Sequence, residues 1–356
     1  MHRMRYLPPR YPFRTTFGYS NAAYMTAGEI IPKVTGLPWS EYVENVILKP
    51  LHMDHTYMRT EGISLKDNLA KPYTVCCNPE GRLTRLPLDQ LDNLGAATGM
   101  VSNVSDLTKW LLLQTDSGRV DNKRILPWSV LNQTRQANTI VSTQKHPFFP
   151  LKYQFYCLGV GLLDYAGYTT FVHSGGAFGY HTNVAFVPEL KLGFAILTNQ
   201  DANKFYEALL WQILDAYMQV PYTNRHQYFF DKARVGEAQN QARLKAMNQR
   251  VTQQTPLPLP LTAYTGTYTH PLYGTITIQA DKGPQTNERL RVYFQHHPGL
   301  TAQLEYMDGQ AFRLTFSNPR WGITAVNFRI ANQQAEQVEI RVSDFVDAEP
   351  YLFRKQ

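Results

Sequence analysis

A histidine, a small hydroxyl residue and two glycines stand together in this sequence, His173-Ser174-Gly175-Gly176, where an apolar run ends. An imidazole can carry a positive charge, and glycine lets another group approach the backbone closely. Backbone N–H groups aimed at one point stabilise a developing oxyanion. The motif therefore predicts a place at the end of a strand where an anion is held.

The segments around this motif predict the sheet that must position it. Three apolar runs follow one another with short turns of glycine, proline and charged residues between them: Phe171–Tyr180, His181–Pro188 and Leu192–Asn199. Short apolar runs separated by such turns are typical of an antiparallel meander. The amphipathic pattern of Ala202–Met218 predicts a helix that closes this unit.

Before the meander, apolar residues recur mostly at helical spacing. Residues 54–94 and 137–157 show little such period, so loops are predicted over 54–94 and irregular structure over 137–157. Ser102 suits the cap of one helix, and Asp106 then lies in its first turns, near the positive end of the helix dipole. The predicted helices are Ala22–Thr35, Trp39–Leu48, the Ser102-capped helix through Leu113, and Pro127–Arg135.

The C-terminal part has a different composition. Gln and Asn dominate residues 237–254, and a run of alternating prolines follows at 256–260, which predicts a linker over 221–262, partly helical and then extended. The period then changes to two, with about eight short strands between Tyr264 and Phe353. Evenly spaced short strands predict a small antiparallel barrel or half-barrel. The predicted domains are therefore 1–220, the linker 221–262, and 263–356.

Composition limits the classes of function. The 356 residues are long enough for two domains, and the net charge of +7 comes from basic residues that form no run of five. We therefore expect no nucleic-acid partner. No stretch reaches the roughly 18 to 20 apolar residues of a membrane helix, and no signal peptide is visible at the start. The sequence leaves the compartment open.

Cysteine and histidine patterns give no support to a metal or cofactor. The three cysteines, Cys76, Cys77 and Cys157, are too few for a disulfide framework. No Cys-x-x-Cys or His-Glu-x-x-His motif occurs. We therefore expect no metal site and no cofactor, and a small-molecule or peptide substrate or ligand.

Several motifs, in order along nearly the whole chain, resemble one known family. Gly18-Tyr-Ser-Asn21, Gly95-Ala-Ala-Thr-Gly-Met-Val-Ser102 and His173-Ser-Gly-Gly176 resemble segments of serine β-lactamase-like hydrolases. Class C β-lactamases, D-alanyl-D-alanine carboxypeptidases and related esterases and peptidases belong to that family. The resemblance implies an α+β fold, an antiparallel sheet with helices. The region from Tyr264 to the end is similar to the lipocalin-like domain that often follows such hydrolases.

The resemblance implies a role for each motif residue. Tyr19 would transfer protons, and Asn21 would hydrogen-bond a substrate amide. His173 would face a substrate carboxylate or orient Tyr19. Ser174 and Gly175 would bind substrate, and Gly176 would offer an oxyanion N–H group. Three simpler interpretations stay open: a core tyrosine, a plain helix cap at Asn21, and a strand histidine with ordinary partners. Histidine at position 173 favours the peptidase and esterase branches over efficient β-lactamases.

The family's nucleophile is not where the resemblance requires it. Family members carry Ser-x-x-Lys upstream of the tyrosine motif, whereas the only Ser-x-x-Lys here is Ser142-Thr-Gln-Lys145, in a predicted surface loop. We expect a family member without its N-terminal piece, with an unpaired sheet edge and an uncovered apolar surface that promote self-association or leave an open groove beside His173. Three hypotheses remain: a hydrolase active only in a longer form, a non-catalytic peptide- or ligand-binding protein, and a hydrolase that uses Ser142.

Overall fold

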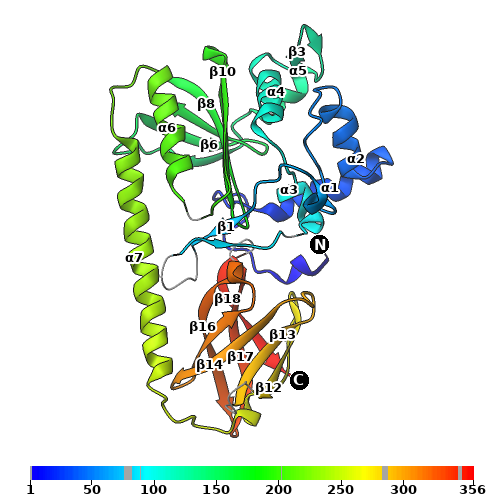
Figure 1. Ribbon diagram of the computed structural model, residues 1–356. Helices are drawn as coiled ribbons and strands as arrows, with labels where there is room; N and C mark the ends of the chain where they lie inside the picture. Colours follow the sequence, from blue (N-terminus) through cyan, green and yellow to red (C-terminus); the bar gives the residue numbers. More distant parts are fainter. Residues whose placement is uncertain (1, 76–81, 89, 202, 283–287, 344–346) are drawn as a thin grey trace. The chain divides into compact units, whose positions relative to one another are not determined.

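The computed structural model describes residues 2–75, 82–88, 90–201, 203–282, 288–343 and 347–356, and the chain forms two compact units (Figure 1). The first, called the sheet unit, consists of Pro9–Thr74 and Pro87–Ala233. The second, called the barrel unit, consists of Met1–Pro8, Val75–Leu86 and Arg234–Gln356. Cys76 and Cys77 lie outside the described residues. The three predicted domains stay a prediction.

A six-stranded antiparallel sheet, in the order β10-β9-β8-β7-β6-β5, organises the sheet unit. The three predicted runs form strands, with β8 and β9 joined residue by residue from Phe171↔Phe186 to Ala177↔Tyr180. The strands are β5 (Thr139–Ser142), β6 (Leu151–Tyr156), β7 (Gly161–Tyr165), β8 (Tyr168–Ala177), β9 (Tyr180–Val187) and β10 (Leu192–Thr198).

The prediction of irregular structure over 137–157 is wrong, because β5 and β6 lie there. Leu151, Tyr153 and Phe155 alternate with polar Lys152 and Gln154, which is the period of a strand. The prolines just before this segment and the register shift where β6 pairs with its neighbours obscure that period.

The helices of the chain form largely where the spacing predicts them. The longer ones are α1 (Asn21–Thr35), α2 (Trp39–Val43) continued by η2 (Glu44–Leu48), α4 (Val104–Thr115), α5 (Trp128–Thr134), α6 (Phe205–Tyr217) and α7 (Arg225–Thr252), which falls in the predicted linker. The shorter elements are η1 (His2–Tyr6), η3 (Ile63–Leu65), η4 (Asp92–Leu94), α3 (Gly95–Thr98), η5 (Pro188–Leu190), β1 (Tyr73–Thr74), β2 (Thr84–Arg85), β3 (Arg119–Val120) and β4 (Lys123–Arg124).

The N-cap of α4 is Asn103 and not the predicted Ser102. The Asn103 side chain accepts a hydrogen bond from the backbone N–H of Asp106, as a capping residue does. Ser102 instead hydrogen-bonds Thr56, at 2.8 Å between the two hydroxyl oxygens. Both residues are good caps by type, so the position of the first turn decided between them.

The two faces of the sheet pack against different helices. Ala185 and Val187 of β9 are buried in a cluster with Leu210 and Leu214 of α6. On the opposite face, Phe171 and Phe186 are buried with Leu111 of α4 and with Cys157. Side chains alternate between faces along a strand, so each residue of β8 is assigned to the α6 face or to the α4 face.

The apolar stripe of α1 is exposed except at Ile31, which is half-buried. Ala23, Ala27, Ile30 and Val34 recur at helical spacing along it and all four are exposed, Ile30 at 51% and Val34 at 77%. Gly28 is the buried residue of α1, and a Cβ there would lie 2.4 Å from Ala96 Cβ, so α1 packs on α3 through a glycine. In the sheet, β10 and β5 are the two edge strands.

The barrel unit confirms the eight predicted strands and resolves the choice between barrel and half-barrel. Its strands pair in chain order, and β11 also pairs with β18, which closes the barrel. They are β11 (Gly266–His270), β12 (Gly274–Lys282), β13 (Glu288–Phe294), β14 (Thr301–Asp308), β15 (Ala311–Phe316), β16 (Ile323–Ala331), β17 (Gln334–Ser343) and β18 (Asp347–Lys355), with the short turns η6 (Leu261–Ala263) and η7 (Pro319–Trp321).

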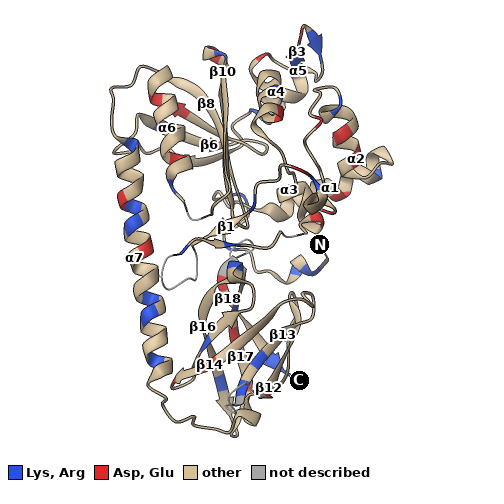
Figure 2. Cartoon of the chain, in the orientation of Figure 1, with Lys and Arg blue, Asp and Glu red and all other residues tan. Residues whose placement is uncertain are grey.

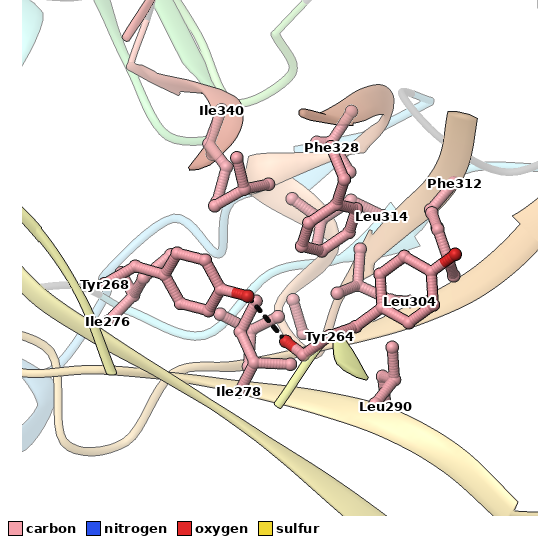
Figure 3. Close-up of a cluster of buried hydrophobic side chains, with 14 of the residues drawn as sticks. Tyr264, Tyr268, Ile276, Ile278, Leu290, Leu304, Phe312, Leu314, Phe328 and Ile340 are labelled. Atoms are coloured by element: carbon pink, nitrogen blue, oxygen red, sulfur yellow. Dashed lines mark hydrogen bonds between the residues drawn. The ribbon is translucent and has the colours of Figure 1, made fainter. Parts of the chain in front are cut away.

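Aromatic and aliphatic side chains fill the barrel (Figure 3). Tyr264, Tyr268, Phe312 and Phe328 are fully buried, and their rings meet edge to face at centroid distances of 5.0 to 6.3 Å. The hydroxyl of Tyr268 donates to the carbonyl oxygen of Tyr264 at 2.8 Å. The aromatic contacts make the barrel interior a packed core.

Charges do not gather into a single patch along α7, the longest helix. Figure 2 shows basic residues at several points of α7, with the acidic Asp231 and Glu237 in its first half. At its C-terminal end, Arg250 forms an ion pair with Asp308 of the barrel unit. None of the helices in the described part of the chain is both long and apolar enough to cross a membrane.

Candidate functional site

Tyr19 and Asn21 meet at the start of α1. Ser20 is the N-cap residue of α1 and its side chain makes no capping hydrogen bond. Asn21 is the first helical residue, and its Oδ1 accepts a hydrogen bond from the Tyr19 hydroxyl at 3.1 Å. The interpretation of Asn21 as a plain helix cap therefore does not describe its side chain. Tyr19 is 53% exposed, so its ring is not a core ring.

His173 of β8 lies beside Tyr19, although the sequence between them includes the helices α1 to α5 and the strands β5, β6 and β7. The ring centroids of Tyr19 and His173 are 6.2 Å apart. His173 pairs with Val184 of β9 and so lies on the α4 face of the sheet. The structure thus brings Asn21 and His173 to either side of Tyr19, and the roles that the resemblance implies for the three residues stay a prediction.

Tyr156, the last residue of β6, completes this cluster. Its hydroxyl oxygen is 3.0 Å from Nε2 of His173. Its ring meets that of Tyr19 edge to face at 6.1 Å and that of Phe17 at 5.1 Å. Tyr156 was missed because its segment was predicted to be irregular; the alternation along β6 was the available signal.

The electrostatics of the cluster keep its phenols protonated. Burial, and then the neighbouring Tyr24, raise the pKa of Tyr19 above its usual value. Burial also raises the pKa of Tyr156 strongly, with further increases from Tyr24 and Tyr19. Among the described residues, the causes of the Tyr19 shift include no lysine or arginine that would lower its pKa. At neutral pH both side chains are therefore hydrogen-bond donors and not bases.

Burial lowers the pKa of His173, and a hydrogen bond with the backbone of Ser174 offsets part of that effect. A lowered pKa makes the imidazole neutral at pH 7. In this structure His173 is thus a neutral hydrogen-bonding group and not a fixed cation that attracts a carboxylate.

Ser174 lies on the other face of the sheet from His173. It pairs with Asn183 and alternates with His173 along β8, which assigns it to the α6 face. Its side chain is exposed. The structure therefore does not bring the Ser174 side chain to the Tyr19 cluster, and its role in substrate binding stays a prediction.

The two glycines of the motif have close neighbours in the protein itself. A Cβ on Gly175 would lie 2.7 Å from Oγ1 of Thr182, and one on Gly176 would lie 3.0 Å from the ring of His181. Both residues are exposed to solvent on their remaining side. A side chain at either position would crowd Thr182 or His181, so glycine suits the packing here, and the substrate approach stays a prediction.

The Ser142 hydroxyl stays close to its own turn. Ser142 ends the edge strand β5, and its Oγ accepts a hydrogen bond from the backbone N–H of Gln144 at 3.2 Å.

Cys157 follows Tyr156 directly, but it is 3% exposed, its thiol donates to the carbonyl of Arg135, and burial raises its pKa. A buried thiol with a raised pKa is a poor nucleophile.

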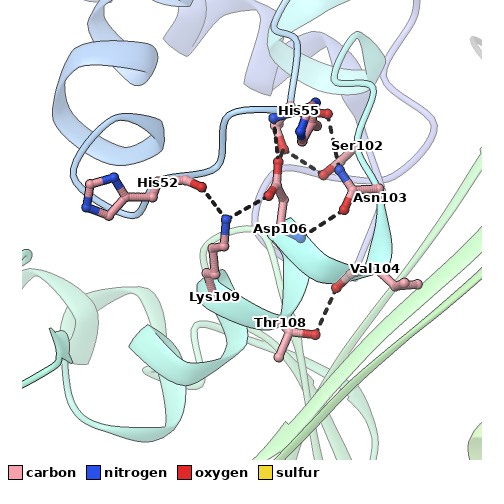
Figure 4. Close-up of polar contacts among 9 residues, drawn as sticks. His52, His55, Ser102, Asn103, Val104, Asp106, Thr108 and Lys109 are labelled. Atoms are coloured by element: carbon pink, nitrogen blue, oxygen red, sulfur yellow. Dashed lines mark hydrogen bonds and ion pairs between the residues drawn. The ribbon is translucent and has the colours of Figure 1, made fainter. Parts of the chain in front are cut away.

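Asp106, placed in the first turn of α4 by the sequence, forms a structural network (Figure 4). Its buried carboxylate accepts hydrogen bonds from the backbone N–H of His55, the hydroxyl of Thr56 and the ammonium of Lys109. Lys109 also donates to the carbonyl of His52. The network ties the loop at 52–56 to α4.

Across the described residues, no group of three or more His, Cys, Asp or Glu side chains is placed to hold a metal ion.

Residues 1–218 match the sequence profile of the Beta-lactamase family, and residues 250–355 match a domain of unknown function (DUF3471). The chain belongs to the beta-lactamase family. As a member, it is related to serine hydrolases, and the α+β sheet with a following closed barrel is the fold that the resemblance implied.

Two curated relatives of this beta-lactamase family chain are hydrolases by name. An Unguisins hydrolase from Aspergillus violaceofuscus (strain CBS 115571) is 26% identical over 88% of this chain and 58% of that protein. Another, from Aspergillus campestris (strain IBT 28561), is 29% identical over 78% of this chain and 52% of that protein. The chain thus spans a little over half the length of these relatives.

Among solved structures, the octameric penicillin-binding protein homologue from Pyrococcus abyssi is similar, with 20% identity, a TM-score of 0.49, and coverage of 96% of this chain and 66% of that one.

Proposed function

We propose that Tyr19, Asn21 and His173 orient the substrate and relay protons in a hydrolase that cleaves an amide or ester through an acyl-enzyme. The observation that carries the proposal is the contact of Tyr19, which is hydrogen-bonded to Asn21, with His173 inside β8. A tyrosine serves in proton transfer only when it lies within reach of the reacting groups. Membership of the beta-lactamase family supports this chemistry.

The nucleophile is the part that these 356 residues do not supply. The only Ser-x-x-Lys is at Ser142–Lys145, where the hydroxyl accepts from its own turn. A lysine near Tyr19 would lower the phenol pKa that burial raises here. We therefore propose that hydrolysis belongs to a form of the protein that contains a Ser-x-x-Lys segment, and that residues 1–356 alone give no turnover.

Two assays test this function. Residues 1–356 are offered a panel of chromogenic esters and amides, and no turnover is expected; turnover that Ser142→Ala abolishes would overturn the proposal. In a form with Ser-x-x-Lys, Tyr19→Phe is expected to lower kcat by about 10²- to 10⁴-fold. The matched control is Tyr217→Phe, an exposed tyrosine of α6. Equal activity of both variants would show that Tyr19 has no catalytic role.

The proposed substrate is a small molecule or a peptide. The Aspergillus relatives are named as hydrolases of unguisins, which supports hydrolysis as the reaction. Because His173 is neutral at pH 7 in this structure, a substrate without a free carboxylate suits the described part of the site.

A second candidate is a non-catalytic peptide- or ligand-binding protein. The raised phenol pKa values favour it, since protonated tyrosines bind polar ligands but do not accept protons. Titration with D-Ala-D-Ala peptides, followed by calorimetry and by product analysis, tests it. Tight binding without product supports this candidate, and no binding to any cell-wall peptide counts against it.

We propose that the chain also self-associates through its uncovered surface. The exposed stripe of Ile30 and Val34 on α1 and the edge strand β10 are the observations that support it. Sedimentation analysis is expected to show association that the double change Ile30→Lys and Val34→Lys weakens. A monomer at all concentrations would contradict the proposal.

The domain division at 1–220, 221–262 and 263–356 is likewise a proposal. The fully buried residues of the closed barrel support the C-terminal domain. Limited proteolysis is expected to cut within 221–262 first, and protection of that whole segment with earlier cuts elsewhere would argue against the division.

A further inference from the structure

Tyr156 is the residue that links the candidate site most directly to the sheet. Its hydroxyl and Nε2 of His173 are 3.0 Å apart, a normal hydrogen-bond distance. Its ring also touches that of His173, at a centroid distance of 6.1 Å and an interplanar angle of 65°. Together with the contacts of Tyr19 to both rings, this makes a closed triangle of three side chains.

We propose that Tyr156 is a positioning residue of this site: its phenol donates to Nε2 of His173 and holds the imidazole neutral, with its ring proton on Nδ1. A phenol can donate to a ring nitrogen or accept from one, and the Tyr156 hydroxyl also hydrogen-bonds Tyr24. We choose the direction in which the phenol donates because the bond with the Ser174 backbone raises the pKa of His173, so the ring donates its proton there. A protonated phenol can donate, and a neutral imidazole accepts through the nitrogen that carries no proton. The backbone of Ser174 hydrogen-bonds the His173 ring as well, which gives the ring a second fixed partner.

The surroundings of His173 support the neutral ring. Burial lowers its pKa, and burial followed by Tyr24 and Tyr19 raises the pKa of Tyr156. The titratable groups around this contact are Tyr19 and Tyr24 at α1, and Tyr156 and Cys157 at the end of β6. None of these named groups is a carboxylate that would favour an imidazolium.

As a consequence, Tyr156 and His173 have different roles in the site. With one ring nitrogen accepting from Tyr156 and the ring also bonded to the Ser174 backbone, His173 is held in one orientation against Tyr19. Tyr156 then acts through His173 and does not need to touch a substrate. The effect of this arrangement on turnover rests on the proposed function, whereas the hydrogen bond itself does not.

The test is NMR spectroscopy of imidazole nitrogens in ¹⁵N-His protein, with the His173 signals assigned through His173→Gln. In the wild type we expect the Nδ1–H tautomer and a His173 pKa below its usual value near 6.5. Tyr156→Phe keeps the ring and removes the donor, so we expect loss of the single tautomer and a rise in the pKa of about 0.5 to 1. Tyr153→Phe removes a hydroxyl from the same strand and is expected to change neither signal.

Two results would overturn the proposal. One is an Nε2–H tautomer of His173 in the wild type, which needs no variant to fold. The other is a Tyr156→Phe protein with an unchanged His173 tautomer and pKa. Failure of the proposed function is a separate outcome: it appears as full turnover in Tyr19→Phe of a form with Ser-x-x-Lys, whatever the state of His173.

Discussion

Tyrosine is used in two different ways in the two units of this protein. In the barrel, Tyr264 and Tyr268 are fully buried, and the hydroxyl of Tyr268 donates to a backbone carbonyl. Beside His173 of β8, Tyr19 is half exposed. The hydroxyl of Tyr19 hydrogen-bonds the side chain of Asn21, and that of Tyr156 hydrogen-bonds the side chain of His173. Burial of the ring with a backbone partner indicates packing, and a hydroxyl paired with a polar side chain in a partly open place indicates a site.

The largest effect on stability is expected in the barrel core. Phe328→Ala removes a fully buried ring that touches Tyr264, Tyr268 and Phe312, so it should cost about 3–5 kcal/mol in the free energy of unfolding. Urea denaturation of the chain measures it, with the partly exposed Tyr293→Ala as control. A loss below about 1 kcal/mol would mean that the barrel interior is not a packed core.

The next largest effect is expected at Asp106, a buried polar group with a structural role. Asp106→Ala leaves the donors of His55, Thr56 and Lys109 without their partner, which should cost about 2–3 kcal/mol. Thermal and urea unfolding at pH 7 measure this loss.

Asp106 is also expected to make the stability of the protein depend on pH. Burial alone would raise the pKa of Asp106, but hydrogen bonds from Lys109, Thr56 and the His55 backbone outweigh it and lower the pKa. A lowered pKa in the folded state gives stability that is present above the unfolded value near 4 and is lost as the pH falls through the folded value. Wild type and Asp106→Ala should therefore converge in stability below about pH 4; a constant difference down to pH 2 would contradict this.

A matched pair inside the barrel gives a smaller effect. Tyr268→Phe removes the donor to the Tyr264 carbonyl and should cost about 1–2 kcal/mol. The hydroxyl of Tyr264 is buried without a partner among the described atoms, so Tyr264→Phe should be neutral or slightly stabilising. Equal losses of unfolding free energy in Tyr268→Phe and Tyr264→Phe would contradict the distinction between a paired and an unpaired hydroxyl.

The smallest stability effect is expected at the candidate site. Tyr19→Phe should change the free energy of unfolding by less than about 0.5 kcal/mol, since the side chain is 53% exposed. A loss above about 1.5 kcal/mol would make Tyr19 a packing residue and would break the comparison between the two units.

The sequence predicted the local parts of this structure well. Eight strands of period two became the barrel, and Tyr19 and Asn21, two residues apart, meet as neighbours. The contact of Tyr19 with His173 followed from the resemblance and not from the residues, because nothing local joins α1 to β8. Tyr156 could be found only once β6 was recognised, since its role depends on a partner in another strand.

Other features depended on choices that composition leaves open. Ser102 and Asn103 are both good caps, and the structure uses Asn103. Ser174 stands next to His173 in the motif, yet alternation along β8 turns it to the other face. The apolar stripe of α1 predicts a helix but names no partner for that face, and in this structure the stripe is exposed.

We propose that these 356 residues hold the substrate-orienting part of a serine hydrolase site without its nucleophile. Incubation of the chain with an active-site-directed fluorophosphonate, followed by intact-mass analysis, tests this proposal. We expect no stoichiometric adduct. An equimolar adduct on one serine, lost when that serine is changed to alanine, would contradict it.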